Sequence, residues 1–304
     1  MTTKKNAKKD SNNAFNFASF HLGLNDNMVC DISKRDFDFG AYSEFKHGGI
    51  NASKKFARIL AQDVLLQFPD FFENYNYDEL AIVPFPFKEL NTAAGQLCNQ
   101  LIKYLNLHLT IEGQAPAIIL NMYKFPGQAS QEHYYPTLNY EERQAILANC
   151  DICIDVNRLM KIKKLLIVDD VFVTGASADK VKSYLNAIGY EGEVKFIYIS
   201  KIDPVTAKET PQIESMLNHY SVKVPLNILD LIKKSDFEWN IRCIKFVLES
   251  KTEDFLKFVE QANQSVLFDM YSHCLRMNYA SEVNYKTNLR ILRQAITQYG
   301  FNGV

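Results

Sequence analysis

Apolar and polar positions follow two different patterns along the chain, and the change falls near Pro204. Before Pro204, short apolar runs bounded by turn residues alternate with longer segments of helical spacing. Short runs of this kind are typical of strands that are buried on both faces. They predict strands at residues 80–83, 117–120, 150–156, 165–168 and 194–199, with helices at 52–68, 93–104 and 178–188. This alternation predicts an α/β domain built on a parallel sheet.

After Pro204 the spacing is helical throughout. Apolar stripes recur at helical spacing, as Ile241, Ile244 and Val247 illustrate. They predict helices at residues 209–220, 237–248, 252–261, 266–276 and 284–299. We therefore expect an all-helical C-terminal module over residues 205–304 that follows an α/β domain over residues 14–204.

The N-terminal residues 1–13 have little apolar content and carry four lysines, which predicts a disordered basic arm. The 304-residue chain has a formal net charge of −1, so no global field favours nucleic acid or a membrane surface. No run approaches 18 apolar residues and no signal peptide opens the sequence, so we expect no membrane partner and a cytoplasmic protein. Cys150 and Cys153 form a single C-x-x-C pair without the second pair that a zinc ribbon needs. We expect both to be buried cysteines at a strand edge.

The segment from Leu165 to Ser177 combines features that suit a phosphorylated sugar. Four apolar residues lead into two carboxylates, Asp169 and Asp170, at the end of a predicted strand. Ligands of parallel sheets bind at the carboxyl ends of the strands. The small residues that follow precede a predicted helix, whose N-terminal N–H groups suit a phosphate. The two acids suit sugar hydroxyls, a metal ion or developing positive charge.

This segment resembles the motif with which type I phosphoribosyltransferases bind 5-phosphoribosyl 1-diphosphate (PRPP). The resemblance implies the type I fold, with Asp169 and Asp170 holding the ribose hydroxyls. It also implies that the next residues wrap the 5′-phosphate, namely Val173, Thr174, Gly175, Ala176 and Ser177. Mg²⁺ is the implied cofactor, with no direct protein ligand and with the two aspartates reaching it through water.

Shorter segments resemble the ComF-like branch of these enzymes, and together they cover about residues 40–203. Residues 45–49 and 83–88 imply that Lys46 and Lys88 bind the pyrophosphate. A polar, aromatic stretch at residues 121–140 predicts a mobile loop that covers the site. Its implied functional side chains are Lys124, His133 and, just beyond it, Arg143.

Two positions depart from the pattern that the resemblance implies. Residues 89–91 read Glu-Leu-Asn where the ComF-like pattern usually carries an arginine near the pyrophosphate loop. Val173 stands where relatives that salvage 6-oxopurines have an aspartate base, which disfavours hypoxanthine or guanine as the acceptor.

Three functions remain open at this point. The first is an enzyme that transfers the 5-phosphoribosyl group from Mg–PRPP to a small nitrogenous base and releases pyrophosphate. The second is a non-catalytic regulator that senses PRPP or a nucleotide. The third is an effector subunit of a larger nucleoprotein complex, related to defence or competence, in which the C-terminal helices bind a protein partner. The sequence does not identify the acceptor.

Overall fold

The computed structural model describes residues 16–26, 28–88, 90–126, 137–234 and 236–298. The chain forms two compact units, and each is discontinuous in sequence. Unit 1 comprises residues 1–37, 53–88 and 94–216, and unit 2 comprises residues 38–52, 89–93 and 217–304. The predicted disordered arm at residues 1–13 lies outside the described residues.

Unit 1 contains a six-stranded sheet in the order β2-β1-β8-β7-β3-β4. Every neighbouring pair is parallel except β1 with β2, which is antiparallel. The strands are β1 (Asn16–Asn25), β2 (Met28–Asp31), β3 (Leu80–Pro84), β4 (Ile118–Ile119), β7 (Lys164–Phe172) and β8 (Glu193–Ile202). A mostly parallel sheet of this kind confirms the α/β class that the alternating pattern predicted.

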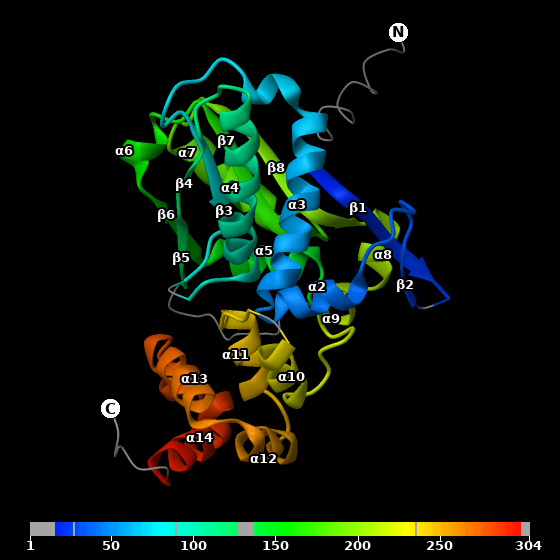
Figure 1. The fold of residues 1–304 in the computed structure, drawn as a ribbon, viewed down its shortest axis with the longest axis vertical. Coiled ribbons are helices and arrows are strands. Elements are labelled where there is room, and N and C mark those ends of the chain that lie inside the picture. Colours follow the sequence, from blue (N-terminus) through cyan, green and yellow to red (C-terminus); the bar gives the residue numbers. More distant parts are fainter. Residues whose placement is uncertain (1–15, 27, 89, 127–136, 235, 299–304) are drawn as a thin grey trace. The chain divides into compact units, whose positions relative to one another are not determined.

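Helices cover both faces of this sheet. The longer ones are α3 (Ile50–Gln67), α4 (Ala93–Ile111), α5 (Tyr140–Ala148) and α7 (Ala176–Ala187). The shorter ones are η1 (Pro69–Phe72), α6 (Val156–Leu159), α8 (Pro204–Glu209) and α9 (Ile213–Asn218). Figure 1 shows α3 and α4 running across one face of the strands. Val181 and Leu185 of α7 join a buried cluster with Leu165 and Ile167 of β7, so α7 covers the other face. All of residues 165–168 are buried, as expected for a central strand between two helical layers.

Two expectations for the middle of the chain were wrong. Residues 121–140 are not all loop, because β5 (Met122–Pro126) pairs antiparallel with β6 (Cys150–Ile154) and α5 begins at Tyr140. Met122 is buried while Tyr123 and Phe125 are exposed, so the segment alternates as a half-buried strand does. Residues 127–136 lie outside the described part. Cys150 is buried as expected, but Cys153 is exposed on the same strand.

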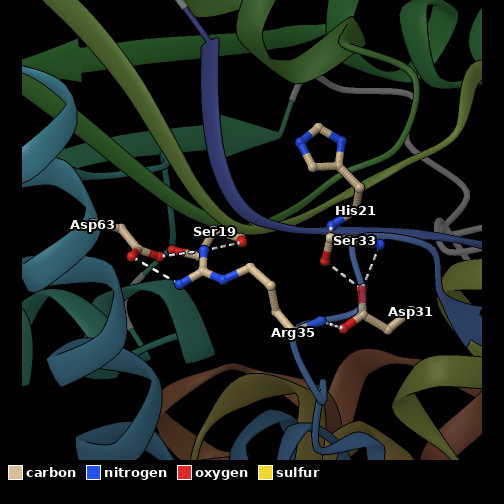
Figure 2. A network of polar contacts seen from close by, with 6 residues as sticks. All are labelled: Ser19, His21, Asp31, Ser33, Arg35 and Asp63. Carbon is tan, nitrogen blue, oxygen red and sulfur yellow. Dashed lines mark hydrogen bonds and ion pairs between the residues drawn. The ribbon is translucent and has the colours of Figure 1, made fainter.

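A polar network anchors the sheet edge that β1 and β2 form (Figure 2). The Arg35 guanidinium donates to both carboxylate oxygens of Asp63 on α3, at 2.8 and 2.9 Å, and to the Ser19 carbonyl oxygen at 2.6 Å. Asp31 accepts hydrogen bonds from the backbone N–H groups of Ser33, Arg35 and Phe37. Burial would raise the pKa of Asp31, but these bonds and the one from the Ser33 hydroxyl lower it. The network therefore ties the turn after β2 to both β1 and α3.

Unit 2 is helical, and it uses two segments from the first third of the chain. Its helices are α2 (Phe39–Lys46), α10 (Leu226–Lys234), α11 (Ile241–Leu248), α12 (Thr252–Gln261), α13 (Gln264–Arg276), η3 (Tyr279–Ser281), η4 (Val283–Tyr285) and α14 (Lys286–Gln298). Gly49 forms an antiparallel bridge with Phe237, and the Ser43 hydroxyl donates to the Asn218 carbonyl oxygen at 2.7 Å. The C-terminal helices were predicted, but this unit differs from a module made of residues 205–304 alone. None of the helices among the described residues has the length and apolar character of a membrane span.

Candidate functional site

The two predicted ribose ligands lie at the carboxyl end of the central strand β7. β7 extends through both carboxylates to Phe172, and the parallel register places Asp169 opposite Tyr198 on β8. Asp170 is 5% exposed, whereas Asp169 is half-buried. Each carboxylate accepts a hydrogen bond of 2.9 Å from the backbone N–H group that follows it. The two acids are thus held by the backbone at the edge where parallel sheets bind ligands.

The turn after β7 has the geometry of an anion-binding helix start. Gly175 occupies the N-cap position of α7 with φ of +86°, and no side chain at that position caps the helix. The left-handed backbone favours glycine there, and a Cβ atom at Gly175 would make a tight contact of 3.0 Å with the Phe172 ring. The Thr174 hydroxyl accepts from the Ala176 N–H at 3.4 Å. The start of a 12-residue helix of this kind has backbone N–H groups and a positive dipole end that suit an anion.

Asp169 influences two buried groups on neighbouring elements. Burial, followed by the negative charge of Asp169, raises the pKa of the Cys98 thiol on α4 well above its ordinary value. The same two causes, in the same order, raise the pKa of the Tyr198 phenol. Both groups therefore stay protonated at neutral pH and present neutral side chains to the carboxylate.

Lys88 and Lys124 are brought to adjoining segments of unit 1. Phe87 N–H donates to the Met122 carbonyl oxygen at 3.2 Å, and Lys124 N–H donates to the Phe87 carbonyl oxygen at 2.8 Å. β5 therefore runs beside the residues that follow β3, and β3 is the neighbour of β7 in the sheet. Both lysine side chains are half-buried.

Arg143 forms a buried ion pair. Its Nη1 atom lies 3.0 Å from Oε2 of Glu214 on α9, and its Nε donates to the Leu138 carbonyl oxygen at 2.8 Å. The two side chains are only 5% and 8% exposed. Sequence reasoning singled out Arg143 but missed Glu214, because no local pattern links positions so far apart in the chain.

Lys46 and His133 are the other two predicted site residues. Lys46 ends α2 in unit 2, where its side chain is 5% exposed and its Nζ atom lies 5.9 Å from the centre of the Tyr42 ring. His133 lies outside the described residues. The proposed role of each stays a prediction.

The start of α5 contacts the first turns of α7, which the sequence did not indicate. The Tyr140 hydroxyl donates to Oδ2 of Asp179 at 3.3 Å, and the Gln144 side chain donates to the Tyr140 oxygen at 3.0 Å. Only the generic capping signal at the start of α5, Asn139 with Glu142, was visible in the sequence.

Comparison with known proteins places the chain in a family. A family model described as PRTase ComF-like matches residues 24–292, which is most of the chain. The chain belongs to the PRTase ComF-like family. The match extends beyond residues 40–203 on both sides, so the helices after Pro204 up to the first half of α14 lie within the region that the ComF-like family model describes. Membership in this family indicates phosphoribosyl transfer as the general class of function.

One similar solved structure is a hypoxanthine phosphoribosyltransferase from Staphylococcus aureus. It shares 12% identity with this ComF-like protein at a TM-score of 0.30, over 50% of this chain and 66% of that chain. The sequence matches no curated protein.

Two carboxylates of this ComF-like protein have the chemistry to bind a hydrated magnesium ion. Among the described residues, no three His, Cys, Asp or Glu side chains gather into a metal cage. Mg²⁺ usually keeps several waters and uses one or two carboxylates together with substrate oxygens. Asp169 and Asp170 supply two such carboxylates at one strand end, so they fit the ion that accompanies PRPP in these enzymes.

Proposed function

We propose that this protein is a phosphoribosyltransferase that binds Mg–PRPP and transfers the 5-phosphoribosyl group to a nitrogenous acceptor, releasing pyrophosphate. The observation that supports this most is the corner between β7 and α7. There, two adjacent carboxylates at a strand end are followed within five residues by a glycine with φ of +86° at a helix start. The carboxylates suit the ribose, and the helix start suits the 5′-phosphate.

In the proposed reaction, Asp169 and Asp170 bind the ribose hydroxyls and fix the orientation of the sugar. Their negative charge also favours the positive charge that develops at C1 as the bond to pyrophosphate breaks. Residues 173–177 hold the 5′-phosphate, which is remote from C1, so the binding energy gained there helps to position the reacting carbon. Bound Mg²⁺ would neutralise charge on the departing pyrophosphate.

Cations near the pyrophosphate would complete the site. The backbone bonds that join Phe87 to β5 bring Lys88 and Lys124 to adjoining segments, which supports this role for both lysines. Lys46 is proposed for the same role from the resemblance alone. A departing polyanion requires such cations, because its charge would otherwise build up in a site that excludes water.

The acceptor is proposed to be something other than a 6-oxopurine. Val173 is 6% exposed and carries no titratable group where the enzymes for those bases have an aspartate. A panel of acceptors should therefore include pyrimidines, other purines and small amines.

Pyrophosphate formation tests the proposal directly. The full chain is incubated with Mg²⁺, PRPP and pooled acceptors, and pyrophosphate is measured with a coupled enzyme assay. We expect acceptor-dependent release that disappears in the Asp169→Asn, Asp170→Asn double variant. Tight PRPP binding without release from any pool would contradict the enzyme and favour the sensing regulator.

A further inference from the structure

Two buried hydroxyl groups on β8 lie beside the proposed ribose site. Tyr198 is 2% exposed and Ser200 is fully buried. Neither the Tyr198 nor the Ser200 hydroxyl oxygen has a hydrogen-bond partner among the described residues. The parallel register pairs Tyr198 with Asp169 and Ser200 with Val171. Tyr198 belongs to the buried cluster that also contains Val181 and Leu185 of α7, so its side chain lies on the face that α7 covers.

The Tyr198 ring is held firmly, although its hydroxyl has no partner among the described residues. The Phe172 ring meets it edge to face with 5.2 Å between ring centres, and the Phe85 ring lies 6.2 Å away. A buried hydroxyl without a partner destabilises a fold by about 1–3 kcal/mol, and phenylalanine would fill the same space without that cost. The hydroxyl therefore needs an explanation other than packing.

Two carboxylates near the Tyr198 hydroxyl are candidate acceptors for its hydrogen bond. Asp169 and then Asp179, in the first turns of α7, are the charged groups that act on the phenol, after the effect of burial. A tyrosine hydroxyl is a hydrogen-bond donor to a carboxylate at neutral pH. Asp169 is the nearer choice in the sheet, since it stands directly opposite Tyr198.

We infer that Tyr198 is a positioning residue whose hydroxyl donates a hydrogen bond to the Asp169 carboxylate when the ribose of the substrate is bound. Such bonds are often long or incomplete before the ligand arrives and shorten in the complex. One carboxylate oxygen of Asp169 is then fixed by Tyr198, and the other faces the sugar hydroxyl. This inference rests on the proposed function, because it assigns a partner to one of the proposed ribose ligands.

Calorimetric titration of Mg–PRPP into matched variants of the full chain tests the inference. Tyr198→Phe should bind about 10-fold more weakly than wild type, since a hydrogen bond to a charged group is lost. The control is Tyr190→Phe, because the Tyr190 hydroxyl donates to the Ile162 carbonyl oxygen at 3.1 Å, next to the other end of β7. It should bind PRPP within about 2-fold of wild type, as should Ser200→Ala. In an Asp169→Ala background, which removes the acceptor, Tyr198→Phe should weaken the remaining binding by less than about 2-fold, because the two side chains act as one unit.

Thermal unfolding and a spectroscopic signal separate positioning from a structural role. Tyr198→Phe should melt at the same temperature as wild type or higher, whereas Tyr190→Phe should melt lower, since it loses a hydrogen bond. In protein labelled at the tyrosine Cζ carbon, the NMR signal of Tyr198, assigned from the Tyr198→Phe variant, should shift when PRPP is added to wild type. At PRPP concentrations that saturate the variant, it should not shift in Asp169→Ala, which has no acceptor side chain at position 169.

The outcomes distinguish this inference from the function on which it rests. Wild type that binds PRPP while Tyr198→Phe binds equally well would overturn the inference and leave the proposed function standing. A Tyr198 signal that does not respond to bound PRPP would do the same. Wild type that binds no PRPP would overturn both.

Discussion

Gly175 shows most clearly how one residue determines the geometry of the candidate site. Its φ of +86° belongs to the left-handed region, and its missing side chain leaves room for the Phe172 ring. The resemblance implied that Gly175 belongs to the residues that wrap the 5′-phosphate, and that role stays a prediction. The structure adds that a Cβ atom at Gly175 would lie 3.0 Å from the Phe172 ring.

Substitution of Gly175 by alanine should therefore affect both stability and binding. Gly175→Ala should lose about 1–2 kcal/mol of unfolding free energy from the left-handed backbone and more from the displaced ring, and PRPP binding should weaken. Gly113→Ala is the matched control, because Gly113 has φ of +73° and a Cβ atom added there would meet nothing within 4 Å. Urea unfolding followed by circular dichroism, together with calorimetry, measures both effects. Equal losses in the two variants would contradict the role of Phe172.

His47 in unit 2 is a fully buried titratable residue, and it predicts a pH dependence. Burial lowers its pKa from 6.5 to about 3, and the nearby His219, Arg242 and Lys46 contribute to this lowering, against the effect of its bond to the Ser43 carbonyl oxygen. Between these two pKa values the unfolded chain binds a proton that the folded chain does not. Stability should therefore be complete above pH 6.5 and fall as the pH falls toward 3, by up to about 5 kcal/mol.

Fluorescence of Trp239 can follow this loss, since Trp239 is the single tryptophan and lies in the core of unit 2. Urea unfolding at pH 7.5 and pH 5.0 should show a smaller difference for His47→Gln than for wild type. The exposed His108 on α4 provides the control, as His108→Gln should behave like wild type. An unchanged pH dependence in His47→Gln would refute the assignment.

At the scale of elements, apolar periodicity predicted the central strands, which are continuous apolar runs, and the helices, which carry a single apolar stripe. Residues 165–168 were predicted as a buried strand, yet β7 continues to Phe172 because the backbone of Asp169, Val171 and Phe172 still pairs with β8. No local pattern could reveal this, since strand pairing depends on residues that lie far away in the sequence. β1 and β2 were not predicted, for the same reason. β5 was predicted as a loop, because residues 121–126 mix aromatic and polar residues.

The ion pair between α5 and α9 should contribute strongly to stability. Arg143→Met should cost about 3–5 kcal/mol, because the Glu214 carboxylate would remain buried without the guanidinium. The Arg143→Met, Glu214→Met double variant should recover much of that loss. The control is Glu193→Gln, since Glu193 pairs with Lys195 and its side chain is 47% exposed, and it should cost less than about 1 kcal/mol. Urea unfolding monitored by circular dichroism measures all three. A loss in Arg143→Met no larger than in Glu193→Gln would contradict this account.

At the scale of the whole molecule, the family match and the division into units both connect the C-terminal helices with earlier parts of the chain. The ComF-like family model reaches residue 292, and unit 2 builds those helices together with residues 38–52 and 89–93. The helical character of the region could be predicted from its apolar stripes. Its discontinuous construction could not, because Gly48 and Gly49 meet Phe237 and Glu238 only in the folded chain.

Gly48 tests whether unit 2 depends on this early segment. Its φ is +99°, and a Cβ atom there would lie 2.3 Å from the Glu238 carbonyl oxygen. Gly48→Ala should lower the unfolding free energy reported by Trp239 fluorescence by more than about 2 kcal/mol. Gly40→Ala is the control, because Gly40 lies on α2 with only an ordinary contact of 3.5 Å to Asp38, and it should leave the transition unchanged. A Gly48→Ala protein as stable as Gly40→Ala would contradict the claim that the close approach of Gly48 to Glu238 stabilises unit 2.

The central claim is that the corner between β7 and α7 binds PRPP through two carboxylates. Calorimetric titration of Mg–PRPP into the full chain, and into the Asp169→Asn, Asp170→Asn double variant, tests it most directly. We predict micromolar binding to wild type and none to the variant, with the same circular dichroism spectrum for both proteins. Absence of binding to wild type, or equal affinity in the double variant, would contradict the claim.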